Sequence, residues 1–463
     1  MVLVMSNNFS SSVLTKLNHK VKKACGQAHE LNLLNNAKNS FIRSSKLGLE
    51  NTINFILGSS STTLNNELER YYDGNSKEMV TPGAIVQSRN KIKPELFGHI
   101  FNLFNKAYPC SKNFNGYRLL AIDGSDLPIH FDLNDPLSIH KGKLKNDGEI
   151  GKACSMLHLN AMYDITNNRF IDYVVQKRTE ADERSALLKM ARRYSGDKAI
   201  FIADRGYEQA NLFELLNLLS PNKYLIRIKD ISSVASLFKK HDLPDDEFDI
   251  DINITFTNYN RAIYIRNPKK YKIIQAFQQF DFLDENNHFY EVNWRIVRVK
   301  KDEDDQKIEK EKDRYELLIT NLSRDEFDAK TIKHLYKLRW NIETAFRYLK
   351  RSCNLLTFMS RKRELIKQEI IAKLIMYNAS AIVKEYLEDK RIGKHKRKHE
   401  HKIDFNNAIH KIIGYYYKRK RKGGQPPDLD SLISNKTLPI RPNRSYIRHT
   451  KATSYQSSAY RFY

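Results

Sequence analysis

The sequence predicts an α/β fold built on a mixed β-sheet, and three observations lead to this prediction. Apolar runs at 117–129, 156–165 and 170–178 are separated by turn residues, as in an antiparallel meander. Helical spacing at 181–194 is followed by another apolar run, "KAIFIADRGY" at 198–207. The stretch "AIFIA" within that run is apolar throughout, which is typical of a central strand covered on both faces.

The next two elements extend this pattern to a recognisable order. "NLFELLNLL" has helical spacing, and "KYLIRIK" reads as a strand. The order is then β-β-β-α-β-α-β, which is that of a ribonuclease H-like fold with a mixed sheet. A last strand, "RYELLITNL" at 314–322, precedes two helices at 336–350 and 368–387.

The segment from 230 to 312 interrupts this order. "FDIDINITFT", "RAIYIR" and "HFYEVNWRIVRVK" alternate or run apolar in the manner of strands, and charged loops flank them. We therefore expect a β-rich insertion at 230–312, which divides the ribonuclease H-like domain into 111–229 and 313–390.

The two ends of the chain are predicted to differ from this domain. Residues 1–110 read as helical, with two short helices broken before Pro94, which suits a first helical position. These two short helices form either a helix-turn-helix or a plain helical pair. The C-terminal tail, 391–463, is basic, and we expect loose structure beyond about residue 423. The histidines within 390–402 suggest either a metal site or a solvated basic segment.

Composition narrows the class of partner. The 463 residues, enough for two or three domains, carry a net charge of +25, which favours a polyanionic partner, nucleic acid first. An anionic membrane surface is the rival, but we find no basic amphipathic helix beside an apolar anchor and no apolar run of about 18 residues. The four scattered cysteines form no CxxC pair, so neither zinc nor disulfides are indicated, and a reducing cytoplasm fits. The first residues make a poor signal peptide.

The helix at 336–350 places four polar residues in one stripe. At about 100° per residue, Tyr336, Arg339, Glu343 and Lys350 span roughly 60° beside an apolar face. Taken alone, the stripe reads equally as a solvated face with Arg–Glu pairing.

Two aspartates, Asp123 in "AIDGS" and Asp204 in "IADRGY", sit at the C-terminal ends of predicted strands. The first strand is expected to enter a turn at Asp-Gly-Ser-Asp. Asp126 competes with Asp123, which we prefer because it directly follows the apolar run, and each aspartate also suits turn capping. With Glu343 they form a trio of carboxylates whose mutual repulsion divalent cations would relieve. Hard cations such as Mg²⁺ take oxygen ligands, and two such ions can promote phosphodiester displacement.

These residues resemble a known family. "DGSD", "ADRGY" and the spacing Tyr336-x2-Arg339-x3-Glu343-x6-Lys350, with the neighbouring Trp340, look like the DDE transposases of bacterial insertion sequences. Within them they match the cut-and-paste group named for its Tyr-Arg-Glu-Lys signature. The long interval after Asp204 is similar to that group's β-strand insertion. The resemblance covers about 45–385, and the basic tail lies outside it.

The resemblance implies a role for each matching residue. Asp123, Asp204 and Glu343 would be catalytic and hold two Mg²⁺ ions, with Mn²⁺ as a substitute. Trp340 would stack on an unpaired base or serve as a packing residue. We expect the remaining DNA contacts from the side chains of Tyr336, Arg339, Lys350, Arg205 and Arg347.

The resemblance also implies a reaction and partners. Water would cleave at the element end, and the freed 3′-hydroxyl would form a hairpin before strand transfer into target DNA. The partners would be the terminal inverted repeats, target DNA and a second copy in a synaptic homodimer, with 1–110 as a DNA-binding region. A silent DNA-binding remnant of such an enzyme is the alternative. A general RNA- or ribosome-binding protein would not need the three carboxylates in register.

Overall fold

The structure of the chain is a computed structural model. It describes residues 8–43, 45–140, 153–259, 261–275, 278–301, 314–391, 400–418 and 428–441.

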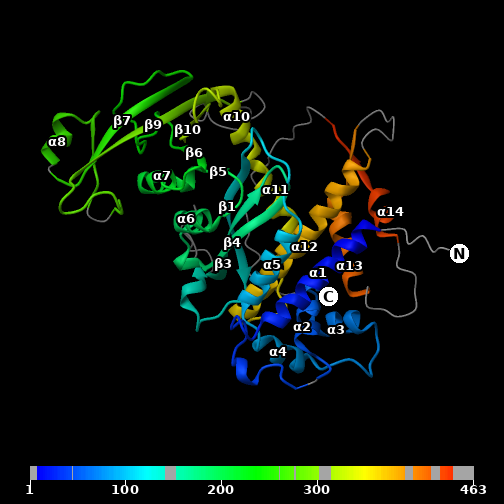
Figure 1. Ribbon diagram of the computed structural model, residues 1–463. Coiled ribbons are helices and arrows are strands. Elements are labelled where there is room, and N and C mark those ends of the chain that lie inside the picture. The colour runs from blue at the N-terminus through cyan, green and yellow to red at the C-terminus, as the bar shows by residue number, and fades with distance from the viewer. Residues whose placement is uncertain are drawn as a thin grey trace, which may run out of the picture.

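The main sheet is formed by ten strands within these residues (Figure 1). They are β1 (Arg118–Ile129), β2 (Ile139–His140), β3 (Cys154–Asp164), β4 (Arg169–Lys177), β5 (Ala199–Ala203), β6 (Lys223–Ile228), β7 (Phe248–Thr257), β8 (Tyr271–Ile273), β9 (Phe289–Lys300) and β10 (Tyr315–Thr320). A separate pair joins β11 (His401–Ile403) to β12 (Thr437–Pro439).

The strand order confirms the predicted fold class. Strand β1 is antiparallel to β3, which is antiparallel to β4, and on its other side β1 is parallel to β5, which is parallel to β6. Three antiparallel strands followed by two parallel ones are the ribonuclease H-like arrangement. Beyond β6 the sheet continues through β10, β9 and β7 to β8.

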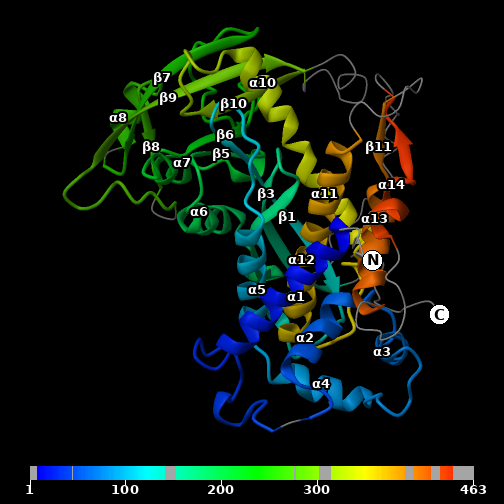
Figure 2. The same ribbon diagram turned by 45° about the vertical axis from the view of Figure 1, so that its right-hand side comes forward.

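Helices cover the sheet and fill the other half of the molecule (Figures 1 and 2). They are α1 (Phe9–Gln27), α2 (Leu49–Gly58), α3 (Leu64–Tyr72), α4 (Pro82–Asn90), α5 (Pro94–Ala107), α6 (Glu183–Arg193), α7 (Ala210–Asn217), α8 (Arg261–Arg266), α10 (Ala329–Leu338), α11 (Trp340–Arg351), α12 (Arg363–Asp389), α13 (Phe405–Lys418) and α14 (Leu429–Ser434). No helix among the described residues has both the length and the apolar character that a bilayer crossing requires.

Side-chain alternation along β1 assigns each residue to one of two cores. Leu119 and Ala121 are buried in a core shared with α5, α11 and α12, whereas Leu120 and Ile122 are buried in a core shared with α6 and α7. Successive side chains of a strand point to opposite faces. Odd-numbered residues of β1 therefore face α11, and even-numbered residues face α6.

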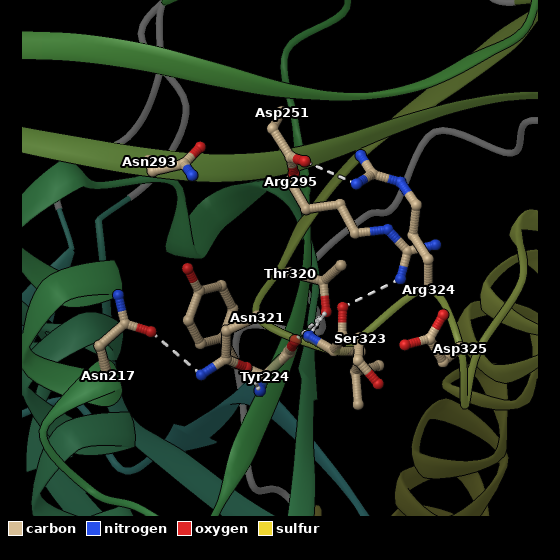
Figure 3. Close-up of a pocket in the computed structure, with 11 residues that line it drawn as sticks. Asn217, Tyr224, Asp251, Asn293, Arg295, Thr320, Asn321, Ser323, Arg324 and Asp325 are labelled. Carbon is tan, nitrogen blue, oxygen red and sulfur yellow. Dashed lines mark hydrogen bonds and ion pairs between the residues drawn. The ribbon is translucent and has the colours of Figure 1, made fainter.

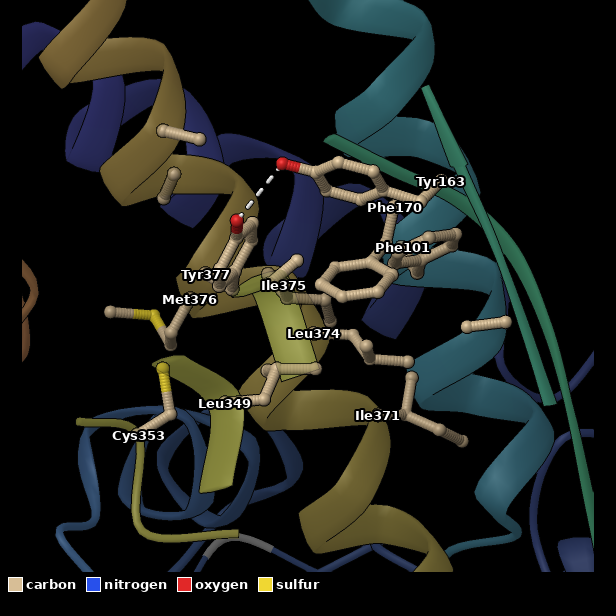
Figure 4. Close-up of a cluster of buried hydrophobic side chains, with 14 of the residues drawn as sticks. Phe101, Tyr163, Phe170, Leu349, Cys353, Ile371, Leu374, Ile375, Met376 and Tyr377 are labelled. Atoms are coloured by element: carbon tan, nitrogen blue, oxygen red, sulfur yellow. Dashed lines mark hydrogen bonds between the residues drawn. The ribbon is translucent and has the colours of Figure 1, made fainter. Parts of the chain in front are cut away.

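The long helix α12 joins the N-terminal and C-terminal helices to the sheet. It packs against α5, α1, α2 and α13 on its sides and against β4. In Figure 4, Tyr377 of α12 meets Phe170 and Tyr163 from the sheet. The ring centroids of Phe170 and Tyr377 lie 4.9 Å apart, and the hydroxyl oxygens of Tyr163 and Tyr377 lie 3.1 Å apart. The helices therefore share one core with the sheet.

The predicted β-rich insertion is partly a continuation of this sheet. Strands β7 and β9 pair with each other and join the main sheet through β10. The prediction of a strand at "RAIYIR" is wrong, because this segment forms α8. Strands β7 and β8 are parallel, and a parallel pair needs a crossover connection, which α8 supplies. The domain boundaries at 230 and 312 stay predictions.

The predicted turn at Asp-Gly-Ser-Asp is also wrong. Strand β1 continues through Gly124 to Ile129, because β3 pairs with it as far as Ile129 opposite Ser155. The parallel pairing with β5 does end there, with Ile122 opposite Ala203. Asp123 thus lies just past the last parallel pair, although it is inside a strand.

The end of the chain is more ordered than predicted. Beyond residue 423, α14 and β12 are formed, so loose structure throughout this region is a wrong prediction. The carboxylate of Asp430 accepts hydrogen bonds from the backbone N–H groups of Phe9 and Ser10, at 2.7 and 2.9 Å. Most of the predicted basic and histidine-rich runs, at 392–399 and 419–427, lie outside the described residues.

The two helices predicted on either side of Pro94 are confirmed as α4 and α5.

A buried ion pair joins α4 to α12. Arg89 Nη2 lies 2.8 Å from Glu369 Oε1, and both side chains are 1% exposed. Arg89 also donates to the Leu365 carbonyl, at 2.9 Å. Removing one member of such a pair leaves an uncompensated buried charge.

We expect Glu369→Ala to lower the free energy of unfolding by about 3 kcal/mol or more, because Arg89 would stay buried without its carboxylate. The matched control is Glu364→Ala, since Glu364 is exposed on the same helix and its pair with Lys367 should contribute less than about 1 kcal/mol. Chemical denaturation followed by circular dichroism measures both. Equal losses in the two variants would contradict the expectation.

Candidate functional site

The central parallel strands bring Asp123 and Asp204 to one edge of the sheet. Each aspartate directly follows the last paired residues of β1 and β5, Ile122 and Ala203. Asp204 begins the short 3₁₀ helix Arg205–Tyr207, and its carboxylate accepts from Gly206 N–H at 2.8 Å. By strand alternation both aspartates point to the α11 side of the sheet.

Arg339 links these aspartates to Glu343. Its guanidinium donates to Glu343 Oε1 at 2.9 Å, and its Nη1 atom lies 4.0 Å from Asp123 Oδ2. Burial, with a smaller contribution from the negative charges of Asp204 and Glu343, outweighs the opposing charge of Arg339 and raises the pKa of Asp123 to about 7. Asp204 and Glu343 are therefore both close enough to Asp123 to affect its ionisation.

The donor set suits a hard cation. Carboxylate oxygens are the ligands that Mg²⁺ and Mn²⁺ prefer. Among the residues that the structure describes, no three His, Cys, Asp or Glu side chains are already gathered at metal-binding distances. In this arrangement the Arg339 guanidinium supplies the positive charge between Asp123 and Glu343. A divalent ion would relieve the same repulsion.

The predicted continuous helix is interrupted at Arg339. Helix α10 ends at Leu338, and Arg339 N–H donates to the Tyr336 carbonyl at 3.0 Å, a three-residue spacing that tightens the turn. Tyr336 therefore lies on α10, whereas Glu343 and Lys350 lie on α11, and the predicted stripe is divided between two helices. Tyr336 is 5% exposed, and its hydroxyl has no hydrogen-bond partner among the described residues. The guanidinium of Arg339 lies 5.8 Å from the centre of its ring.

The other predicted DNA contacts differ in their exposure. Lys350 is half-buried at the far end of α11, and the charges of Asp126 and Asp123 favour its ammonium form, whereas burial lowers its pKa. Trp340 is 40% exposed. Arg205 directly follows Asp204, Arg347 lies one helical turn after Glu343, and both arginines are exposed.

Asp126 belongs to a different cluster on the opposite face of the sheet. It lies directly across from His158 of β3, whose Nδ1 atom is 2.7 Å from Asp126 Oδ1. His158 Nε2 is 3.2 Å from Glu183 Oε1 of α6. Arg178 Nε adds a contact of 3.3 Å to Asp126. These partners hold Asp126 in an ion-pair network and leave Asp123 for the site.

Sequence reasoning missed His158 and Glu183. Both approach the backbone of the site closely, since a Cβ atom at Gly124 would lie 2.4 Å from His158 Nε2 and 2.6 Å from Glu183 Oε1. The sequence does contain a feature that could have identified His158. His158 stands between the apolar residues Leu157 and Leu159, and strand pairing places it directly opposite Asp126.

A polar cavity of about 510 Å³ lies at the other end of the strands (Figure 3). It is bounded by the first residues of β6 and the last residues of β10, whereas Asp204 follows the opposite end of β5. Its side chains bind one another. Asn321 donates to Asn217 at 3.0 Å, and Arg324 Nη1 lies 2.5 Å from Asp251 Oδ2. The cavity is therefore a joint between β10 and the insertion strands and does not contribute to the carboxylate site.

A mixed sheet of ribonuclease H-like order, with acidic residues at the ends of its central parallel strands, defines a class of nucleic-acid-processing enzymes. The family described as "Transposase DDE domain" matches residues 114–379, more than half of the chain, and the chain belongs to this family. Enzymes of this family generally act with divalent metal ions.

Named relatives match a short part of the chain. The putative transposase InsL of insertion sequence element IS186A from Escherichia coli K12 is 41% identical over 59 residues. The transposase of insertion sequence element IS421 from Escherichia coli matches to the same extent. The matched segment is 13% of this chain and spans 16% of each relative. Among solved structures, a piggyBac transposase synaptic complex with hairpin DNA aligns with a TM-score of 0.41 and 11% identity, over 95% of this chain and 85% of that chain.

The His158 network should make stability depend on pH. Hydrogen bonds and charges from Asp126 and Glu183 outweigh burial and raise the pKa of His158 to about 9. The contribution, at most about 3 kcal/mol, should be present in full below about pH 6.5 and lost as the pH rises through 9. We expect His158→Gln to cost most at pH 6 and little at pH 10, measured by denaturation across this range. His99→Gln, whose site lowers the histidine pKa, is the control and should lack this trend.

Proposed function

We propose that the chain is a transposase that catalyses cut-and-paste transposition of its own insertion sequence. The reaction is metal-dependent phosphodiester hydrolysis and strand transfer at the element ends. One observation carries the proposal: Asp123 lies within electrostatic range of Asp204 and Glu343, and Arg339 lies close to both Asp123 and Glu343. Membership of the transposase family supports it.

The three carboxylates would hold two Mg²⁺ ions, with Mn²⁺ as a substitute. Their oxygens match the ligand preference of these ions. Burial, and to a lesser extent the charges of Asp204 and Glu343, raises the pKa of Asp123, and a bound cation would favour its ionised form. Two such ions, when bound, activate an attacking oxygen and stabilise a leaving oxygen. The rigid, buried strands β1 and β5 fix the two aspartates, and Arg339 orients Glu343.

The cationic residues of α10 and α11 would bind the substrate backbone. Arg339 and Lys350 both face the carboxylates, so each can contact a phosphate placed there. The exposed side chains of Arg205 and Arg347 can add outer backbone contacts. Trp340, which is 40% exposed, can stack on an unpaired base. This set agrees with membership of the Tyr-Arg-Glu-Lys group, in which a hairpin intermediate is formed.

The proposal includes the partners of the reaction. The DNA substrates are the terminal inverted repeats and the target duplex, which the net charge of +25 would attract. The N-terminal helices would contribute to DNA binding, and two copies would form a synaptic homodimer on two ends. The compartment is the cytoplasm, where such DNA is accessible.

The first test is cleavage of the protein's own element ends. Purified protein is incubated with labelled duplexes that carry the genomic flanks of its reading frame, with Mg²⁺, with Mn²⁺ or with EDTA. We expect metal-dependent cleavage at the element end. The cleavage rate of Glu343→Gln should be about 1,000-fold lower, because the substitution replaces a charged carboxylate ligand by a neutral amide. Binding of these duplexes without any cleavage by the wild-type chain would instead indicate a silent DNA-binding remnant.

A second test separates the two aspartates of β1. We expect Asp123→Asn to abolish metal-dependent cleavage, because Asp123 faces Arg339 and Glu343. Asp126→Asn should lower stability but retain cleavage at a temperature where the variant is folded, because Asp126 is bound to His158 on the other face. Cleavage rates under single-turnover conditions measure both. Retained cleavage in Asp123→Asn would refute this assignment.

A further inference from the structure

The strands β7 and β9, with α8 and β8, form an arm that projects beyond the rest of the sheet (Figure 1). Strand β10 pairs with β9 only from Arg295 to Lys300, so β9 continues from Trp294 to Phe289 with β7 as its partner. At about 3.3 Å per residue this part of the arm is roughly 20 Å long. Helix α8 and strand β8 lie at its far end.

The far end of the arm is basic. Residues 258–280 contain five Lys or Arg and no Asp or Glu. Lys240 comes from another segment and places its ammonium 4.8 Å from the Tyr264 ring of α8. We call the exposed cations here the tip face. Its members are Lys239, Lys240, Arg266, Lys269 and Lys270.

Most of these charges are not neutralised within the chain. Among the residues that the structure describes, Lys269 is the member of the tip face that pairs with a carboxylate, that of Asp242. The next acidic residues along the arm are engaged elsewhere. Asp281 accepts from Asn211 of α7 at 3.1 Å, and Asp284 accepts from the backbone N–H of Asn286 at 2.7 Å. The tip face therefore presents concentrated positive charge to solvent.

Exposed apolar side chains stand beside these cations. Tyr259 is 63% exposed, Ile265 is 66% exposed and Phe289 is 43% exposed, with the rings of Tyr259 and Phe289 6.2 Å apart. Lysine is depleted at protein–protein interfaces, whereas lysine and arginine with exposed aromatic rings are typical of nucleic-acid surfaces. The composition favours DNA over a second copy of the chain.

The arm borders the part of the chain that follows Asp204. A cavity of about 550 Å³ separates the arm from the loop after Asp204, and its lining includes Arg184, Glu208, Lys272 and Gln278. Arg184 Nε donates to the Gly206 carbonyl at 3.2 Å, two residues after Asp204. Arg184 therefore lies between the loop that follows Asp204 and the cavity that borders the arm.

We propose that the tip face binds the phosphate backbone of duplex DNA, at a place separate from the carboxylate site. The proposal rests on the proposed function and deepens it. The duplex is either a longer part of the element end or the target DNA. Both sources present the same phosphates, and the roughly 20 Å of projecting arm corresponds to about six base pairs at 3.4 Å per pair.

The test uses the full chain and two matched variants. Lys240→Ala/Arg266→Ala/Lys270→Ala removes three cations from the tip face. Lys189→Ala/Arg192→Ala/Lys330→Ala removes three exposed cations from α6 and α10 as the control. Fluorescence anisotropy is measured over a range of salt concentrations with four duplexes: a short element end, the same end extended inward, the same end extended into the flank, and an unrelated target.

We expect the tip variant to bind at least one longer duplex about tenfold or more weakly than the wild type and the control at 150 mM salt. Its plot of log affinity against log salt should be shallower by about 2 to 3, since each lost phosphate contact removes about 0.9. Binding of the short end should stay unchanged. Loss on an extended end identifies element DNA as the source, and loss confined to the unrelated duplex identifies target DNA.

Three results would overturn the proposal. They are equal losses in the tip and control variants, unchanged binding of every duplex by the tip variant, and a change of its mass by light scattering, which would indicate a contact between copies. Metal-dependent cleavage by the wild type, measured in parallel, keeps the two proposals distinguishable. If cleavage occurs while the tip variant binds normally, the tip proposal fails and the proposed function stands. If the wild type neither binds nor cleaves, the proposed function itself fails.

Discussion

Repulsion between like charges is the constraint that organises this molecule around its site. The buried strands β1 and β5 end side by side, so Asp123 and Asp204 are held near one another where water cannot screen them well. Glu343 arrives from α11 and adds a third negative charge. The Arg339 guanidinium lies at this meeting point, and the interruption between α10 and α11 at that residue places its side chain there.

The helical half of the molecule holds this arrangement in place. Helix α11 can present Glu343 only if it stays pressed against the sheet, and α12 packs behind it together with helices from both ends of the chain. The core around Tyr377 and Phe170 is continuous from the sheet into these helices. Residues remote in sequence thus hold the helix that carries Glu343 against the strand that carries Asp123.

The sequence predicted most of the fold, because strands and helices of the central domain have strong periodic patterns. It failed where pairing decided the outcome. A partner strand carries β1 through the Gly124 position, and a parallel pair converts the β-branched segment "RAIYIR" into a crossover helix. The same limit applies to the site. Asp123 and Asp126 read alike until the two cores show which face each occupies, and the contact of Asp126 with His158 depends on strand register.

The continuity of the sheet from β1 to the arm has a mechanical consequence. Strands β7 and β9 are joined through β10 and β6 to the strands that carry the two aspartates by a continuous ladder of backbone hydrogen bonds, so the base of the arm cannot leave the sheet without breaking that ladder. The number of residues in β7 and β9 therefore sets the distance between the base of the arm and its tip. Two residues added to each strand would lengthen the span by about 7 Å and keep every side chain on its face, whereas one residue would invert them all.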